Sequence, residues 1–190
     1  MRLWKKSTSI LCLCVFLLVS CALSQDAPVF AVRAAAIDHG ALTAQLNWQP
    51  SAVLLDALDH GIALTFEITL RAEESARFGW HSTLARIRWH RELRYFPLTR
   101  QYQLGDPDLA PTSSAETRSY AARASLIAAI ADLHLDLPPS WPHTELPGAV
   151  VDRYSLRIDL ERDNLPGALR LPALIDADWR LSSGNYLWKP

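Results

Sequence analysis

The chain has 190 residues, of which 49% are hydrophobic and 21% charged, a composition typical of a globular protein with its own core. The formal net charge is −1, and it becomes −4 if Arg2, Lys5 and Lys6 are removed with an N-terminal signal. Neither value provides the basic surface that a nucleic-acid partner requires. All three cysteines lie within the first 21 residues, so the rest of the chain has no thiol for a disulfide, a zinc ligand or a nucleophile.

The N-terminal segment predicts export. Its three cations precede an apolar run from Ile10 to Val19, which is about half the ~20 residues that a membrane-spanning helix needs. A basic start, a short apolar run and an exit of small residues are typical of an export signal. We therefore expect the mature protein outside the cytoplasm.

Two cleavage sites remain as alternatives for this signal. The segment Leu18-Val19-Ser20-Cys21 resembles the lipobox of bacterial lipoproteins, which would make residues 1–20 the signal and Cys21 the lipid attachment point. Cleavage after Ser24 would instead make the signal 1–24 and leave a protein without a lipid. Only seven residues separate Cys21 from the first expected strand, which slightly favours cleavage after Ser24. A lipid on Cys21 is the only membrane attachment that the sequence indicates.

Alternating apolar and polar residues predict a chain rich in antiparallel strands. The expected strands are 29–36, 41–48, 62–71, 86–95, 98–104, 116–120, 153–161 and 176–183, and the alternation is clearest in 62–71, 86–95 and 153–161. Only Arg91 breaks the apolar side of the strand over 86–95.

Two helices are expected, over 51–60 and 121–133. Ser51 is placed to cap the first helix and Gly61 to end it. We therefore expect residues 25–190 to form a single β-rich domain. Its fold would be mostly antiparallel β with two helices (α+β), as a β-sandwich or a strongly curled sheet.

No pattern for metal binding or catalysis stands out. Asp56 and His60 share a helix face but have no third ligand nearby, and His134 and His143 only flank a proline-rich loop. The chain has no G-x-S-x-G elbow and no glycine-rich phosphate loop. The sequence therefore predicts no metal site, no cofactor and no enzymatic activity.

Four basic side chains of the strand over 86–95 would share one face: Arg86, Arg88, His90 and Arg94. This arginine stripe could dock an anionic lipid, a glycan or an acidic partner. The alternative is cross-strand pairing with the acidic residues Glu67, Asp159 or Glu161, at roughly 0.2–1 kcal/mol per pair.

Tryptophan is the other candidate for contact with a ligand or partner. Trp48 and Trp89 are in phase with the apolar sides of their strands, which favours core packing. Trp80 and Trp141 lie in turn or loop contexts, so we expect these two to be exposed.

Five motifs carry a resemblance to a known family. They are, in chain order, LDHGIAL (58–64), YFPLTRQY (95–102), YSLRIDL (154–160), LPGALRLP (165–172) and DWRLSS (178–183). Together they resemble an exported proteobacterial family, domain of unknown function 4390 (DUF4390), from about Val29 to Trp188. One departure is that the tryptophan cluster usual in the family is reduced here to Arg77-Phe78-Gly79-Trp80.

The resemblance implies a periplasmic protein of the Gram-negative envelope and supplies no catalytic residues. It also implies an accessory role beside a sensor kinase, because genes of the family often neighbour one. We therefore expect a non-enzymatic interaction module with an envelope protein partner. The alternatives are a glycan, lipid or small-ligand binding domain that uses Trp80, Trp141 and the arginine stripe, and, less favoured, an envelope hydrolase.

Overall fold

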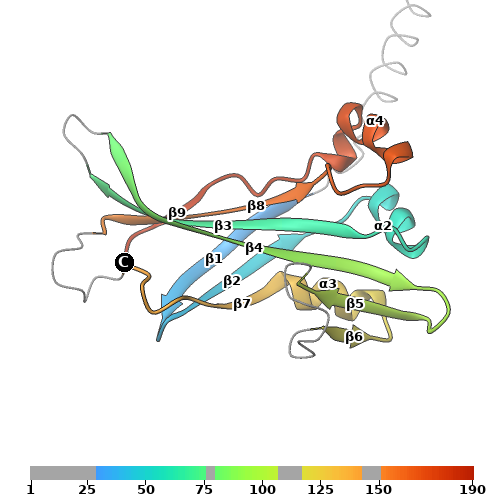
Figure 1. Ribbon diagram of the computed structural model, residues 1–190, viewed down its shortest axis with the longest axis horizontal. Helices are drawn as coiled ribbons and strands as arrows, with labels where there is room; N and C mark the ends of the chain where they lie inside the picture. Colours follow the sequence, from blue (N-terminus) through green and yellow to red (C-terminus); the bar gives the residue numbers. More distant parts are fainter. Residues whose placement is uncertain (1–28, 76–79, 107–116, 143–150) are drawn as a thin grey trace, which may run out of the picture.

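The computed structural model describes residues 29–75, 80–106, 117–142 and 151–190. Within these ranges the chain forms two antiparallel sheets, three α-helices and one 3₁₀-helix (Figure 1). The elements are β1 (Phe30–Asp38), β2 (Ala41–Trp48), α2 (Ala52–Asp59), β3 (Leu64–Ser75), β4 (His81–Phe96), β5 (Gln101–Gly105), β6 (Arg118–Tyr120), α3 (Arg123–Ala131), β7 (Asp132–Asp136), β8 (Arg153–Glu161), α4 (Gly167–Ile175), η3 (Ala177–Trp179) and β9 (Tyr186–Trp188).

The mostly antiparallel β fold expected from the sequence is confirmed. One sheet has the strand order β1-β2-β7 and the other β6-β5-β4-β3-β8-β9. The larger sheet curls over the smaller one as a half-barrel (Figure 1). The described chain contains no helix of the length and hydropathy needed to cross a membrane. The export signal and Cys21 lie outside the described residues.

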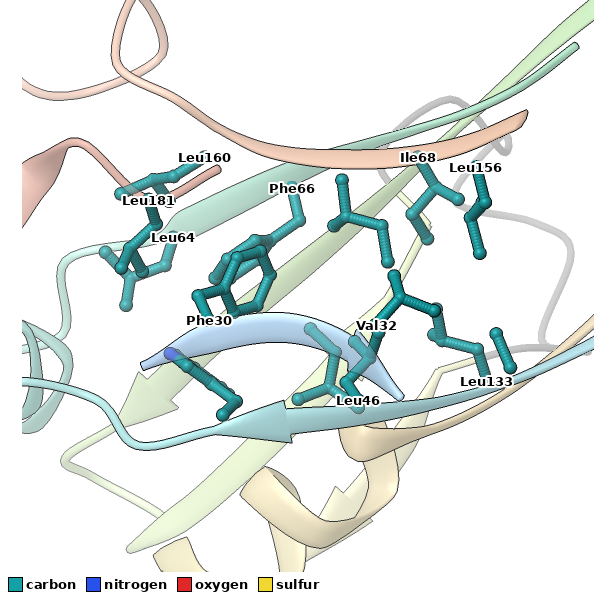
Figure 2. Close-up of a cluster of buried hydrophobic side chains, with 14 of the residues drawn as sticks. Phe30, Val32, Leu46, Leu64, Phe66, Ile68, Leu133, Leu156, Leu160 and Leu181 are labelled. Carbon is teal, nitrogen blue, oxygen red and sulfur yellow. The ribbon is translucent and has the colours of Figure 1, made fainter. Parts of the chain in front are cut away.

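The core fills the space between the two sheets. Phe66 of β3 reaches across it, with its ring centroid 5.7 Å from that of Phe30 and 5.3 Å from that of Trp48. Period-two alternation on the strands places most of their other apolar side chains on the inner faces, and α2 and α3 add buried residues of their own. Figure 2 shows side chains of both sheets meeting there, among them Phe30, Val32, Leu46, Phe66, Ile68 and Leu156.

The first expected helix forms as α2. Ser51 Oγ accepts a hydrogen bond from the Leu54 amide at 3.3 Å, which confirms the N-cap. The chain leaves this helix through Gly61, whose φ is +81° and whose missing Cβ would lie 3.3 Å from the Tyr95 carbonyl oxygen. A side chain there would be strained in backbone conformation and also crowded against β4.

The second expected helix is shorter than predicted. α3 ends at Ala131, because Asp132–Asp136 continues as β7 and pairs with β2 from Ala41 to Gln45. Leu133 and Leu135 are buried in this strand, so the core selects period two where the local sequence also allowed a helix.

Two further differences concern the C-terminal third. A third helix, α4, forms around Pro172, a residue that argues against a helix interior, so the expected number of two helices was wrong. The strand expected over 176–183 was also wrong: this segment contains η3 and only a single bridge between Ser182 and Asp159. The last strand is β9, which pairs with β8 through Tyr186, Leu187 and Trp188.

Candidate functional site

The longest strand, β4, has a partly open edge. It has 16 residues and pairs with β3 from His81 to Leu93, whereas β5 pairs only with Glu92–Phe96 (Figure 1). From His81 to Trp89, β3 is therefore the only strand paired with β4 among the described residues. The peptide groups on the other side of such an edge form a template for an additional strand. We call His81–Trp89 the β4 edge.

Exposed side chains accompany this edge. Trp80, directly before β4, is 74% exposed, as the sequence predicted, and Leu84 is 39% exposed. Arg86 and Arg88 are also exposed. A large aromatic ring and two cations thus lie along one open strand, a combination that favours a docking surface over a purely structural edge.

The arginine stripe exists as predicted on one face of β4. The register places His90 opposite Glu67, Arg88 opposite Thr69 and Arg86 opposite Arg71 of β3. Arg94 continues this face near the end of the strand, where its guanidinium lies 5.3 Å from the centre of the Phe96 ring. Arg86, Arg88 and Arg94 are exposed, and His90 is half-buried.

The cross-strand pairing considered as the alternative also occurs at part of this stripe. Arg88 Nη1 lies 3.7 Å from Glu67 Oε2, and His90 Nε2 lies 3.2 Å from Glu161 Oε1. Asp159 pairs elsewhere, with Arg157 of its own strand at 2.6 Å. The stripe therefore contains two paired positions, the half-buried His90 and the exposed Arg88. Arg86 and Arg94 reach into solvent.

The exposure expected for Trp141 was wrong. This side chain is only 4% exposed, because the segment after β7 folds back: the Leu137 amide donates to the Gly40 carbonyl and the Trp141 amide to the Pro138 carbonyl, each at 2.8 Å. Trp141 instead lines a cavity of about 520 Å³ at the end of the two sheets. The other lining residues are Ile37, Asp38, His39, Gly40, Leu137, Pro138, Pro139, Tyr154 and Pro190.

The apparent break in the β4 pattern at Arg91 has a structural explanation. Its guanidinium pairs with Asp106 at 3.1 Å, with both side chains mostly buried (15% and 12% exposed). Asp106 follows β5 directly. The pair thus joins β4 to the end of β5 and lets a cation occupy the inner side of the sheet.

A second polar network joins α2 to β5 and α3. The Tyr102 hydroxyl donates to Asp59 Oδ1 at 2.8 Å, and Arg123 binds the other oxygen of the same carboxylate. Burial, followed by this hydrogen bond, raises the pKa of Tyr102 to about 12. Asp59 and Tyr102 belong to two of the sequence motifs quoted above, so the fold joins segments that are far apart in the chain.

Two groups of potential metal ligands occur among the described residues. Asp56 and His60 share a helix face as expected, with His60 Nδ1 3.5 Å from Asp56 Oδ1, but both are exposed and no third ligand joins them among the described residues. One cluster that the sequence did not predict appears on the sheet: Glu67, His90 and Glu161. Sequence spacing could not reveal it, because its three members come from three separate strands.

These features define a two-sheet, mostly antiparallel β protein with a partly open strand edge and a polar cluster on the larger sheet. The chain belongs to the family described as Domain of unknown function (DUF4390), whose sequence model matches residues 31–189. The family resemblance of the five motifs is thereby confirmed. No match was found among curated proteins or among solved structures.

Proposed function

We propose that the protein is a non-enzymatic interaction module of the cell envelope that binds an extended segment of a partner protein along the β4 edge. The observation that carries this proposal is the unequal length of β4 and its neighbour: β5 pairs with Glu92–Phe96 and leaves the β4 edge, the nine residues His81–Trp89, open on that side among the described residues. A partner strand added there would gain main-chain hydrogen bonds, which supply affinity in β-strand addition.

The side chains beside the edge set the chemistry of the partner. Trp80 offers a large anchoring ring, and Arg86 and Arg88 favour a segment that carries acidic residues. The same arginines disfavour pairing of two copies of this chain through their β4 edges, because like charges would face each other. An acidic, extended segment of another protein is therefore the ligand that fits best.

The setting of this interaction follows from the N-terminal sequence. The signal-like segment supports export, and the resemblance of the motifs supports a periplasmic location and an accessory role beside a membrane sensor kinase. A periplasmic segment of such a kinase, or of another envelope protein, is the class of partner proposed. Lipidation of Cys21 would keep the module at the membrane beside it.

Site-specific photo-crosslinking in intact cells tests the proposal. A photoreactive residue at Leu84 should yield an adduct with an envelope protein, whereas one at Ala124, which is exposed on α3, should not. Trp80→Ala and Arg86→Glu should each reduce the Leu84 adduct severalfold while leaving the fold intact by circular dichroism. Equal adducts at both positions, or an adduct insensitive to both substitutions, would contradict the proposal.

A second candidate function rests on the cavity lined by Trp141 and Tyr154. Its volume of about 520 Å³ lies within the range of small-ligand pockets, and two aromatic walls suit a glycan or a lipid chain. A ligand screen by tryptophan fluorescence tests this function. Binding there should be lost in Trp141→Leu and kept in Trp80→Ala, and the opposite result would move the ligand site away from the cavity.

A further inference from the structure

Three potential metal ligands converge on the outer face of the six-stranded sheet. Glu67 lies on β3, and the strands on either side of it supply His90 (β4) and Glu161 (β8). Their ligand atoms all lie within 4.8 Å of one another, and this is the one such group of three among the described residues. The strand register produces it, since Glu67 faces His90 directly and Glu161 faces Thr65, two residues before Glu67 on β3.

The distances between these atoms suit a tetrahedral cation. His90 Nε2 lies 3.2 Å from Glu161 Oε1 and 3.9 Å from Glu67 Oε2. Zinc bonds to imidazole nitrogen and carboxylate oxygen are about 2.0–2.2 Å long, which places neighbouring ligands of a tetrahedron about 3.3–3.6 Å apart. The two measured separations bracket this range, so small side-chain rotations would complete the site.

Both carboxylates are oriented by neighbouring side chains. Thr69 Oγ1 donates to Glu67 Oε1 at 2.9 Å, and Asn164 Nδ2 donates to Glu161 Oε2 at 2.5 Å. In each glutamate the oxygen turned toward His90 is the other one, Oε2 of Glu67 and Oε1 of Glu161. Hydrogen bonds of this kind orient the side chains that bind the metal directly in metal sites.

The cluster is accessible without being fully solvated. The side chains of Glu67, His90 and Glu161 are 27%, 24% and 25% exposed. Such burial reduces the competition from water for the ligands while leaving an entry path for an ion.

We propose that Glu67, His90 and Glu161 form a binding site for a divalent transition-metal ion of the zinc type. An imidazole nitrogen with two carboxylate oxygens is a donor set suited to Zn²⁺, and three protein ligands leave the fourth tetrahedral position for water. Arg88, whose Nη1 lies 3.7 Å from Glu67 Oε2, is the local competitor for this oxygen. It is 59% exposed, so it moves into solvent when the ion binds.

Zinc titration of the purified protein by calorimetry tests the site at neutral pH. We expect one Zn²⁺ per chain, with affinity reduced at least tenfold in His90→Gln and in Glu161→Gln. Arg88→Gln should bind zinc more tightly than the wild type, because the competing cation is gone. Co²⁺ should bind at the same site and give the visible absorption of a tetrahedral complex.

The matched control is His134→Gln. His134 is an exposed strand histidine with Asp132 and Asp136 two residues away on either side, yet among the described residues it belongs to no converging group of three. Its substitution should leave zinc affinity unchanged, and circular dichroism should show that every variant keeps the wild-type spectrum. Absence of binding at one equivalent, or wild-type affinity in both His90→Gln and Glu161→Gln, would overturn the proposal and leave the cluster as an ion-pair network only.

Discussion

Tyr102 links three elements through one carboxylate. Its hydroxyl donates to Asp59 at the end of α2, and Arg123 at the start of α3 binds the same side chain. The centre of the Tyr95 ring lies 4.6 Å from that of the Tyr102 ring, so the two rings pack against each other. Because Asp59 precedes the left-handed Gly61, this network fixes the point where the chain leaves α2 to enter β3.

The raised pKa of Tyr102, about 12, makes this link sensitive to alkaline pH. The ordinary value is 10.0, so folding favours the neutral phenol, and its contribution to stability is complete below pH 10 and lost as pH rises toward 12. Tyr102→Phe should lower the free energy of unfolding by about 1 kcal/mol at pH 8. Urea unfolding at several pH values should show this difference narrowing above pH 10, and a difference that stays constant to pH 12 would contradict it.

At the scale of single elements, α4 presents an apolar surface to solvent. Leu171, Leu174 and Ile175 are 71%, 53% and 78% exposed, whereas Ala173 is fully buried. Arg180 donates to the carbonyls of Leu174 and Ile175 and so stabilises the end of the helix. The helix is therefore fixed by the buried Ala173, by Leu169, which packs against the core, and by its C-terminal cap. Its other large apolar side chains are turned outward.

Two adjacent positions of α4 should differ strongly in their tolerance of substitution. Leu174→Gln should change the free energy of unfolding by less than about 0.5 kcal/mol, because the side chain is already exposed. Ala173→Leu should cost about 1–3 kcal/mol, because the added atoms have no space in the core. Chemical denaturation of both variants measures this, and a larger cost for Leu174→Gln would mean that α4 is rotated relative to the structure.

At the scale of the whole molecule, stability depends on contact between the two sheets. Phe66 is fully buried and contacts Phe30 and Trp48 across the interface, so it joins the sheets at one point (Figure 2). The three rings meet in tilted or edge-to-face arrangements, which are favourable for aromatic pairs.

Truncation at this point should be costly. Phe66→Ala should lower the free energy of unfolding by about 3–5 kcal/mol, through lost burial and the cavity that remains. Phe96→Ala is the matched control, because Phe96 is only half-buried at the end of β4 and should cost clearly less. Thermal or urea unfolding compares the two, and equal losses would show that the inter-sheet contact has no special role.

Local sequence patterns predicted most of the elements but not those that depend on a neighbour. The strands around Phe66 and Leu156 alternate strongly and were predicted correctly, and the Ser51 cap marked α2. β7 was missed because its residues follow α3 directly and become a strand only by pairing with β2. The burial of Trp141 follows from the folding back of its segment, which a main-chain hydrogen bond from Leu137 to the distant Gly40 fixes and which no local pattern contains.

By itself, the sequence determined the antiparallel β class, the stripe on β4 and the family, because period-two alternation and motif order are properties of the linear chain. The tertiary structure decided which parts of that stripe are paired and which are open. Strand register brings Glu67 and Glu161 to His90, and the short β5 leaves the β4 edge unpaired by any other described strand. Both outcomes depend on contacts between residues far apart in the chain, and therefore only the folded protein displays its candidate sites.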